Sequence, residues 1–199
     1  MATTTPNYGW NVPTSADYVA QGAVAIQTLG DEIDATVFGL PSGALTLISA
    51  TTIGTAVSSV TVTGAFSSTY DAYKIIVTGG ATSVGSPVAL QLGSVTSAYK
   101  YALVYGGYVS GSVGTDTAAA AASFTPVGRM ETNGISANIE LANPFLACQT
   151  RFFAPYSDVS NGGSISGLQD SVTSFTSFII SRATGTMTGG TIAVYGYAK

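Results

Sequence analysis

The sequence predicts an all-β protein, a jelly-roll-like antiparallel β-sandwich preceded by an N-terminal arm and a short oligomerising α-helix. From Leu45 onward, apolar and polar residues alternate and turn residues recur at short intervals, which is typical of strands. Residues 15–37 instead repeat apolar side chains at helical spacing. We therefore expect two domains: residues 1–40 form the arm and anchoring helix, and residues 41–199 form the sandwich.

The arm is expected to be extended, because Pro6 and Pro13 disfavour a helix before them. Tyr8 and Trp10, the only tryptophan in the chain, lie between these prolines. Exposed aromatic side chains of this kind often mark a contact surface. We expect Tyr8 and Trp10 to dock the arm on a neighbouring protein.

The helix predicted over residues 15–37 carries a heptad pattern. Val19, Ile26 and Ile33 recur at sevens, and Leu29 occupies the d position of the same register. Two glycines weaken the helix by nearly 1 kcal/mol each, so it would be marginal alone. We expect Val19, Ile26, Leu29 and Ile33 to line a seam between copies. Packing on the chain's own domain and insertion into a partner are the alternatives.

The β-domain is predicted to consist of short strands separated by glycine pairs, with Asn133-Gly134 as the strongest hairpin signal. A run of five alanines, Ala118–Ala122, is flanked by Thr and Ser and is expected to be a loop. The expected strands are Leu45–Ala50, Val57–Thr63, Tyr73–Thr78, Val88–Leu92, Tyr99–Tyr105, Phe124–Arg129, Ile135–Leu141, Arg151–Phe153, Ser164–Leu168, Phe175–Arg182 and Ile192–Tyr197.

The composition excludes several functions. Charged residues make up 8% of the chain, against about 25% in an ordinary domain. Six Lys and Arg residues cannot neutralise many phosphates, so we expect no nucleic-acid binding. No stretch provides 18 consecutive apolar residues, and no secretory signal precedes the arm, so we expect no membrane insertion and synthesis in a cytoplasm.

Catalytic chemistry is also restricted. The chain has no His and one Cys, which excludes the Ser-His-Asp and Cys-His arrangements and leaves too few ligands for zinc. The carboxylates of the β-domain show no spacing that singles out a glycosidase pair. We expect no catalytic, metal or cofactor site, and a protein that is not an enzyme.

Tyrosines are the most informative polar residues of the β-domain. Tyr99, Tyr101 and Tyr105 share one face of a predicted strand, and Tyr108 follows a glycine pair. Tyrosine suits half-hydrated interfaces and stacking on sugars. We expect these four rings to contact the core or another subunit in the first instance, with glycan binding as the alternative.

The net charge of −4 belongs entirely to the N-terminal part. Residues 1–40 contain Asp17, Asp31, Glu32 and Asp34 and no Lys or Arg, whereas the remaining chain has six acids and six bases. A neutral, hydroxyl-rich domain suits close packing between copies, because burying charge is costly. The two parts are therefore expected to have different roles.

Four segments resemble known proteins. Asn7–Asp17 and Gly22–Asp34 resemble the N-terminal segment of tailed-bacteriophage virion proteins of the minor tail, fibre or appendage type. Phe66–Val77 and Thr188–Gly196 are similar to a compact β-sandwich found at the ends of such proteins.

This resemblance implies a homotrimeric virion component that is assembled in the host cytoplasm and attached through its N-terminal segment. Its partners would be other virion proteins, either of the tail and baseplate or the major capsid protein, and a host-surface glycan. No shaft separates helix and sandwich, which favours a knob over a long fibre. Capsid decoration and a carbohydrate-binding module are the alternatives, and a depolymerase is a more distant one.

Overall fold

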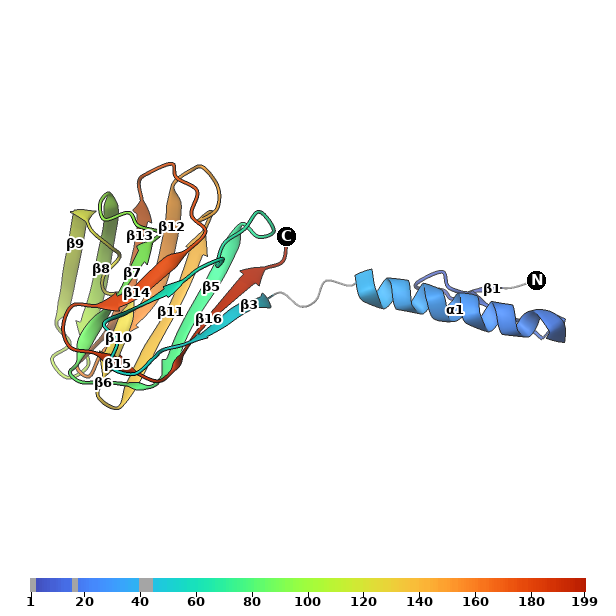
Figure 1. Ribbon diagram of the computed structural model, residues 1–199, viewed down its shortest axis with the longest axis horizontal. Helices are drawn as coiled ribbons and strands as arrows, with labels where there is room; N and C mark the ends of the chain where they lie inside the picture. Colours follow the sequence, from blue (N-terminus) through green and yellow to red (C-terminus); the bar gives the residue numbers. More distant parts are fainter. Residues whose placement is uncertain (1–2, 16–17, 40–44) are drawn as a thin grey trace. The chain divides into compact units, whose positions relative to one another are not determined.

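The computed structural model describes residues 3–15, 18–39 and 45–199, apart from the side chains of Val19 and Ala20. The chain divides into two compact units, Met1–Ser42 and Gly43–Lys199. The predicted boundary between residues 40 and 41 lies outside the described residues. Antiparallel strands dominate the described part of the chain, which confirms the all-β class (Figure 1).

The first unit is a short hairpin and a helix. Strand β1 (Thr3–Thr4) pairs with β2 (Asn11–Val12), and helix α1 spans Val19–Gly39. The arm is therefore folded back on itself and not extended, because Gly9 adopts a positive φ of 69° and the Gly9 amide donates to the Thr5 carbonyl. None of the side chains described in residues 3–39 is buried, so this unit has no core of its own.

The second unit is built from fourteen strands in the described part of the chain, most of them in one large sheet. They are β3 (Leu45–Thr52), β4 (Ser59–Val62), β5 (Ala72–Gly79), β6 (Ala81–Thr82), β7 (Ser86–Leu92), β8 (Tyr99–Gly107), β9 (Val113–Ala121), β10 (Gly128–Glu131), β11 (Gly134–Ala142), β12 (Thr150–Ser157), β13 (Asn161–Gln169), β14 (Phe178–Arg182), β15 (Met187–Thr188) and β16 (Thr191–Tyr197).

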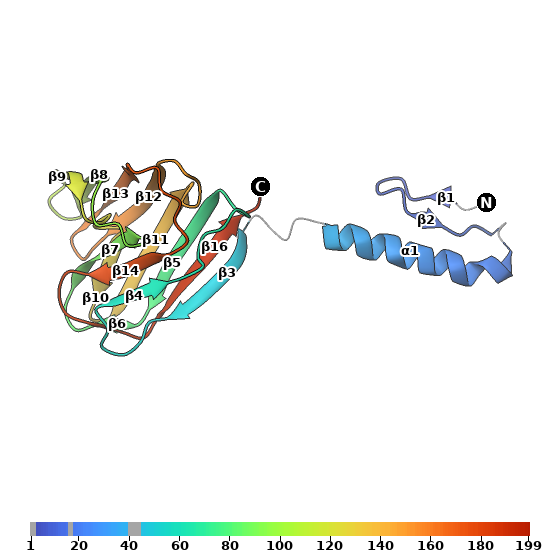
Figure 2. The same ribbon diagram turned by 45° about the horizontal axis from the view of Figure 1, so that its top comes forward.

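The large sheet branches at β11. One edge of β11 pairs with β5, which continues through β16 to β3. The other edge pairs with β10 near Ile135 and with β12 near Leu141. From β12 the sheet runs through β13 and β8 to β9, while β10 leads to β7, β14 and β4 (Figures 1 and 2).

The core lies between the branch formed by β10, β7, β14 and β4 and the rest of the large sheet. Phe66 packs edge-on against Tyr73 of β5, with ring centroids 4.9 Å apart, and against Phe178 of β14 at 5.7 Å. Phe124 contacts Phe152 of β12 at 3.9 Å. Inward residues of β5, β7, β11, β14 and β16 are almost entirely buried and belong to the same cluster, so the branch through β7 and β14 covers the inner face of β5 and β11.

Turn chemistry explains where the strands end. The hairpin predicted around Asn133-Gly134 is confirmed, because β10 and β11 pair from Glu131 and Gly134 outward. The glycine pairs at 79–80 and 189–190 all have positive φ. A Cβ on Gly80 would lie 2.1 Å from the Gly189 carbonyl oxygen, so the two glycine turns can approach only without side chains.

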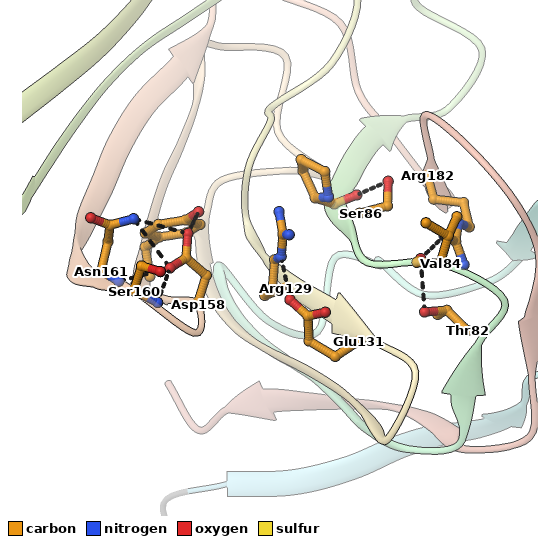
Figure 3. Close-up of polar contacts among 11 residues, drawn as sticks. Thr82, Val84, Ser86, Arg129, Glu131, Asp158, Ser160, Asn161 and Arg182 are labelled. Carbon is orange, nitrogen blue, oxygen red and sulfur yellow. Dashed lines mark hydrogen bonds and ion pairs between the residues drawn. The ribbon is translucent and has the colours of Figure 1, made fainter. Parts of the chain in front are cut away.

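A buried arginine ties several turns together. Arg182, at the end of β14, is 8% exposed. Its guanidinium donates hydrogen bonds to the carbonyls of Thr184, of Thr186 at 2.7 Å, and of Val84. Figure 3 shows the bond to Val84. Burial lowers the pKa of Arg182, and the three backbone acceptors satisfy the charge in place of a carboxylate.

The predicted loop at Ala118–Ala122 is wrong, because most of this run belongs to strand β9. β9 pairs with β8 so that Gly114 lies opposite Tyr105 and Ala118 lies opposite Tyr101. Small residues therefore face the large rings of the neighbouring strand. An alanine run has no polar–apolar alternation, which is why the sequence pattern did not reveal the strand.

Candidate functional site

A cleft of the β-unit with a volume of about 490 Å³ lies beside strands β8 and β9. Tyr101, Tyr105 and Tyr156 contribute aromatic rings, and Asp116 and Asp158 contribute carboxylates. The other lining residues are Pro87, Leu103, Thr115, Thr125, Pro126 and Asn161. The walls therefore combine aromatic area with hydrogen-bonding groups, as small-molecule sites do.

Asp158 is held rigidly at the turn between β12 and β13. Its Oδ1 accepts hydrogen bonds from the backbone amides of Ser160 and Asn161, both at 2.7 Å. Its Oδ2 accepts the Tyr156 hydroxyl proton at 2.7 Å, and the Asn161 side-chain amide lies 3.2 Å from Oδ1 (Figure 3). This carboxylate is largely satisfied from within the chain, so it fixes the shape of the cleft.

These contacts shift the pKa values of the cleft. Burial alone would raise the pKa of Asp158, but the hydrogen bonds from Tyr156, Ser160 and Asn161 outweigh it and lower the pKa to about 2. Burial and the bond to Asp158 raise the pKa of Tyr156. The pKa of Tyr101 is raised by burial and by the negative charge of Asp116. Asp158 is therefore ionised at neutral pH, while Tyr101 and Tyr156 remain protonated.

A cation lies close to the cleft but is already paired. The Arg129 Nε donates to Glu131 Oε1 at 2.7 Å (Figure 3). This hydrogen bond and the nearby negative charges raise the pKa of Arg129, although burial alone would lower it. None of the cleft-lining residues in the described part of the chain is Lys or Arg. The cleft itself is therefore negatively charged.

Glycine positions the Tyr105 ring. A Cβ at Gly114 would lie 2.5 Å from Cζ of Tyr105, so the ring lies directly over the β9 backbone at this residue. Any larger residue at position 114 would push the ring from its place.

The four tyrosines predicted from the sequence have three different surroundings. Tyr101 and Tyr105 line the cleft. Tyr99 is fully buried in the core, where burial raises its pKa to about 12, so it contacts neither a glycan nor a subunit. Tyr108 is 60% exposed and outside the cleft, with its hydroxyl over Gly162.

Sequence reasoning missed the remainder of the site. Asp116 belongs to β9, a strand that the sequence pattern did not predict. Tyr156, Asp158 and Asn161 come from the end of β12, the following turn and the start of β13, far along the chain. Only the pairing of β8 with both β9 and β13 brings these residues together. The Asp-x-x-Asn spacing at 158–161 was the one local signal of a turn held by its side chains.

The predicted arm residues lie within the first unit. Trp10 Nε1 donates to Thr36 Oγ1 on α1 at 2.9 Å, and Asn11 bonds to the Glu32 carboxylate with its amide at 2.6 Å. Tyr8 stacks on Trp10 with ring centroids 5.0 Å apart and stays 62% exposed. The arm thus covers one side of its own helix.

The arm covers only part of the seam predicted from the sequence. Leu29 lies among half-buried residues on the arm side of α1, one turn from Glu32, and Ile33 is half-buried at the edge. Ile26 is 65% exposed, and the side chain of Val19 lies outside the described residues. Beside the arm runs a stripe of small and apolar residues at spacings of three and four, here called the uncovered stripe because all its members except Ile33 are exposed: Ala23, Ile26, Gly30, Ile33 and Val37.

Comparisons give no further identification. Among the described residues, no group of three or more His, Cys, Asp or Glu side chains could hold a metal ion. The helix in the described part is not long and apolar enough to cross a membrane. No known protein family, no curated protein and no solved structure matches this chain.

Proposed function

We propose that the chain is a non-enzymatic structural protein of a tailed-phage virion. In this proposal it is a homotrimeric, knob-type appendage whose first unit joins the copies and attaches them to the particle. Its β-unit is a jelly-roll-like sandwich that faces outward and contacts the host surface.

The observation that carries this proposal is the contrast between the two units. The β-unit has a complete core, whereas no described side chain of residues 3–39 is buried. An isolated helix of about 20 residues with two glycines in its interior is marginal in water. The first unit therefore requires contacts from outside itself, and other copies of the same helix are the simplest source.

The uncovered stripe on α1 supports contact between copies. Its spacing of three and four residues is that of a coiled-coil seam, and none of its members is charged. Ile26 and Val37 are 65% and 59% exposed. Burying the exposed part of each side chain would contribute about 1–2 kcal/mol per copy. The stripe and the predicted seam have Ile26 and Ile33 in common. Leu29 belongs only to the predicted seam, whereas Ala23, Gly30 and Val37 belong only to the stripe.

The carboxylates support a role without catalysis. Glycoside hydrolysis needs one carboxyl group with a raised pKa to serve as the acid. The pKa of Asp158 is instead lowered to about 2, and its oxygens accept hydrogen bonds from its own turn. The virion assignment rests on the resemblance of Asn7–Asp17 and Gly22–Asp34, and on the scarcity of charge.

Sedimentation of the full chain tests the oligomer. We expect a trimer for the wild type and a monomer for Ile26→Asp, because a carboxylate would be buried in the seam. Val24→Asp is the matched control, since Val24 is 66% exposed but lies on another face of α1. A wild type that stays monomeric at all concentrations, or equal dissociation of both variants, would contradict the proposal.

Copy number in purified particles tests the location. A tail appendage would be present in a small multiple of three, which counting of peptides by mass spectrometry measures. Hundreds of copies would instead indicate capsid decoration, and absence from particles would refute the virion assignment.

A further inference from the structure

The cleft beside β8 and β9 is open to solvent at an edge of the large sheet. β9 pairs only with β8 among the described strands, and Asp116 on β9 is exposed. Tyr101 and Tyr105 are half-buried, so each ring presents part of its surface to the cleft. The volume of about 490 Å³ lies within the range of about 300–1,000 Å³ that small-molecule sites occupy.

Several polar groups of the cleft have no partner. The hydroxyls of Tyr101 and Tyr105 and the carboxylate of Asp116 form no hydrogen bond within the part of the chain that the structure describes. The Tyr156 hydroxyl donates to Asp158 and retains acceptor capacity. The cleft thus offers donors, a charged acceptor and aromatic surface within one volume, which are the groups that bind sugar hydroxyls and C–H faces.

The negative charge restricts the ligand further. Asp116 and Asp158 line the cleft, and Arg129 is paired with Glu131 at 2.7 Å. An anionic sugar would be repelled by both carboxylates. An organic cation would be attracted to carboxylates and ring faces, but it would leave the tyrosine hydroxyl donors unused. A polyhydroxylated neutral ligand uses all of these groups.

The site is also preorganised. Asp158 is fixed by its turn, and Tyr105 is fixed over Gly114, where a Cβ would lie 2.5 Å from the ring. Little side-chain freedom is therefore lost when a ligand stacks on Tyr105, which favours binding.

We propose that this cleft binds a neutral saccharide, with Tyr105 and Tyr101 as stacking surfaces and Asp116 as the principal acceptor for sugar hydroxyls. The inference rests in part on the proposed host-facing role, to which it assigns a ligand class. The two proposals fail separately, because sedimentation reports the trimer and titration reports the cleft.

The test is binding of the full chain to an array of bacterial-type oligosaccharides, both neutral and uronic-acid-containing, followed by calorimetric titration of those retained. We expect neutral oligosaccharides to bind and their acidic counterparts not to bind. Trimer-dependent avidity affects the array but not the affinity per site. Ile26→Asp should therefore weaken the array signal and leave the titrated dissociation constant unchanged.

Variants assign binding to the cleft. Tyr105→Ala should raise the dissociation constant at least about tenfold, equivalent to about 1.4 kcal/mol, through loss of ring contact. Tyr108→Ala is the control, because Tyr108 lies just beyond the same strand face but outside the cleft. Should Tyr105→Ala fail to fold, Asp116→Asn at an exposed position tests the same site and should weaken neutral binding severalfold.

Three results would overturn the proposal. The first is a wild type that retains no neutral oligosaccharide at millimolar concentration. The second is equal binding of neutral and acidic forms, or tighter binding of a tetraalkylammonium probe than of any sugar. The third is a Tyr108→Ala variant that loses as much affinity as Tyr105→Ala or Asp116→Asn.

Discussion

The Tyr99 hydroxyl replaces a missing strand partner at the end of β7, so removing this hydroxyl should lower the free energy of unfolding. Phe124 and Leu90 exchange backbone hydrogen bonds beside β7, but this pairing stops before Leu92. The Leu92 amide donates instead to the Tyr99 hydroxyl at 2.8 Å, and that hydroxyl donates to the Val95 carbonyl at 3.1 Å. Tyr99→Phe deletes both bonds and leaves the ring in place.

The size of the effect follows from burial. Tyr99 and Leu92 are both fully buried, so water cannot replace the missing partner of the Leu92 amide. An unpaired buried donor costs about 1–3 kcal/mol. The edge-to-face contact with Phe124, at 4.8 Å and 89°, does not involve the hydroxyl and should persist. We expect a loss of about 2 kcal/mol of unfolding free energy, or about 4–8 °C in Tm for a domain of this size.

Urea denaturation of the full chain, followed by tyrosine fluorescence, measures this loss. Tyr101→Phe is the matched control, because Tyr101 lies on the same face of β8 and its hydroxyl has no hydrogen bond within the described part of the chain. We expect the control to change the unfolding free energy by less than about 0.5 kcal/mol. Equal stability of Tyr99→Phe and wild type, or equal losses in both variants, would refute the reasoning.

Four further outcomes are expected. The pKa of Asp158 is lowered to about 2, so the stability that it contributes is complete above about pH 4 and is lost as the pH falls towards 2. In urea denaturation measured over a series of pH values, the midpoint should fall less steeply at low pH for Asp158→Asn than for the wild type. Arg182→Leu removes the donors to three buried-turn carbonyls and should cost about 2–4 kcal/mol by thermal melting, with Arg182→Lys between it and wild type. Thr150 is fully buried and its Oγ1 lacks a hydrogen-bond partner in the described residues, so Thr150→Val should be neutral or stabilising by up to about 1 kcal/mol in chemical denaturation. Gly80→Ala should lower Tm by several degrees or prevent folding, because φ is 69° and the new Cβ would overlap the Gly189 carbonyl, and unchanged circular dichroism melting would contradict this.

Strand alternation revealed much of the β-unit. The pattern Ala137, Ile139 and Leu141 marked the buried face of β11, and all three residues are buried. Phe124–Arg129 was expected to be a strand, but β10 begins only at Gly128. Phe124 makes a single bridge to Leu90, so the segment is buried like a strand without being paired like one. Burial and pairing leave the same apolar signature in a sequence, and only the tertiary structure separates them.

The candidate site was predictable only in part. Tyr101 and Tyr105 were identified because alternate residues of one strand share a face. Tyr99 satisfies the same rule but is fully buried in the core of the β-unit, and depth along a strand has no local signature. The remaining walls of the cleft depend on which strands pair with β8, and pairing partners far apart in sequence are not encoded by local periodicity.

The position of β16 has a consequence for synthesis of the protein. This strand, Thr191–Tyr197, lies between β3 and β5, so Leu45 at the start of the β-unit pairs with Tyr197 near its end. On the ribosome, β3 and β5 cannot join one sheet until the last of these strands has emerged. Nascent chains would therefore present two unpaired edges, which favour association with other chains. Productive assembly thus requires either shielding of the edges of β3 and β5 or completion of β16 faster than neighbouring chains meet.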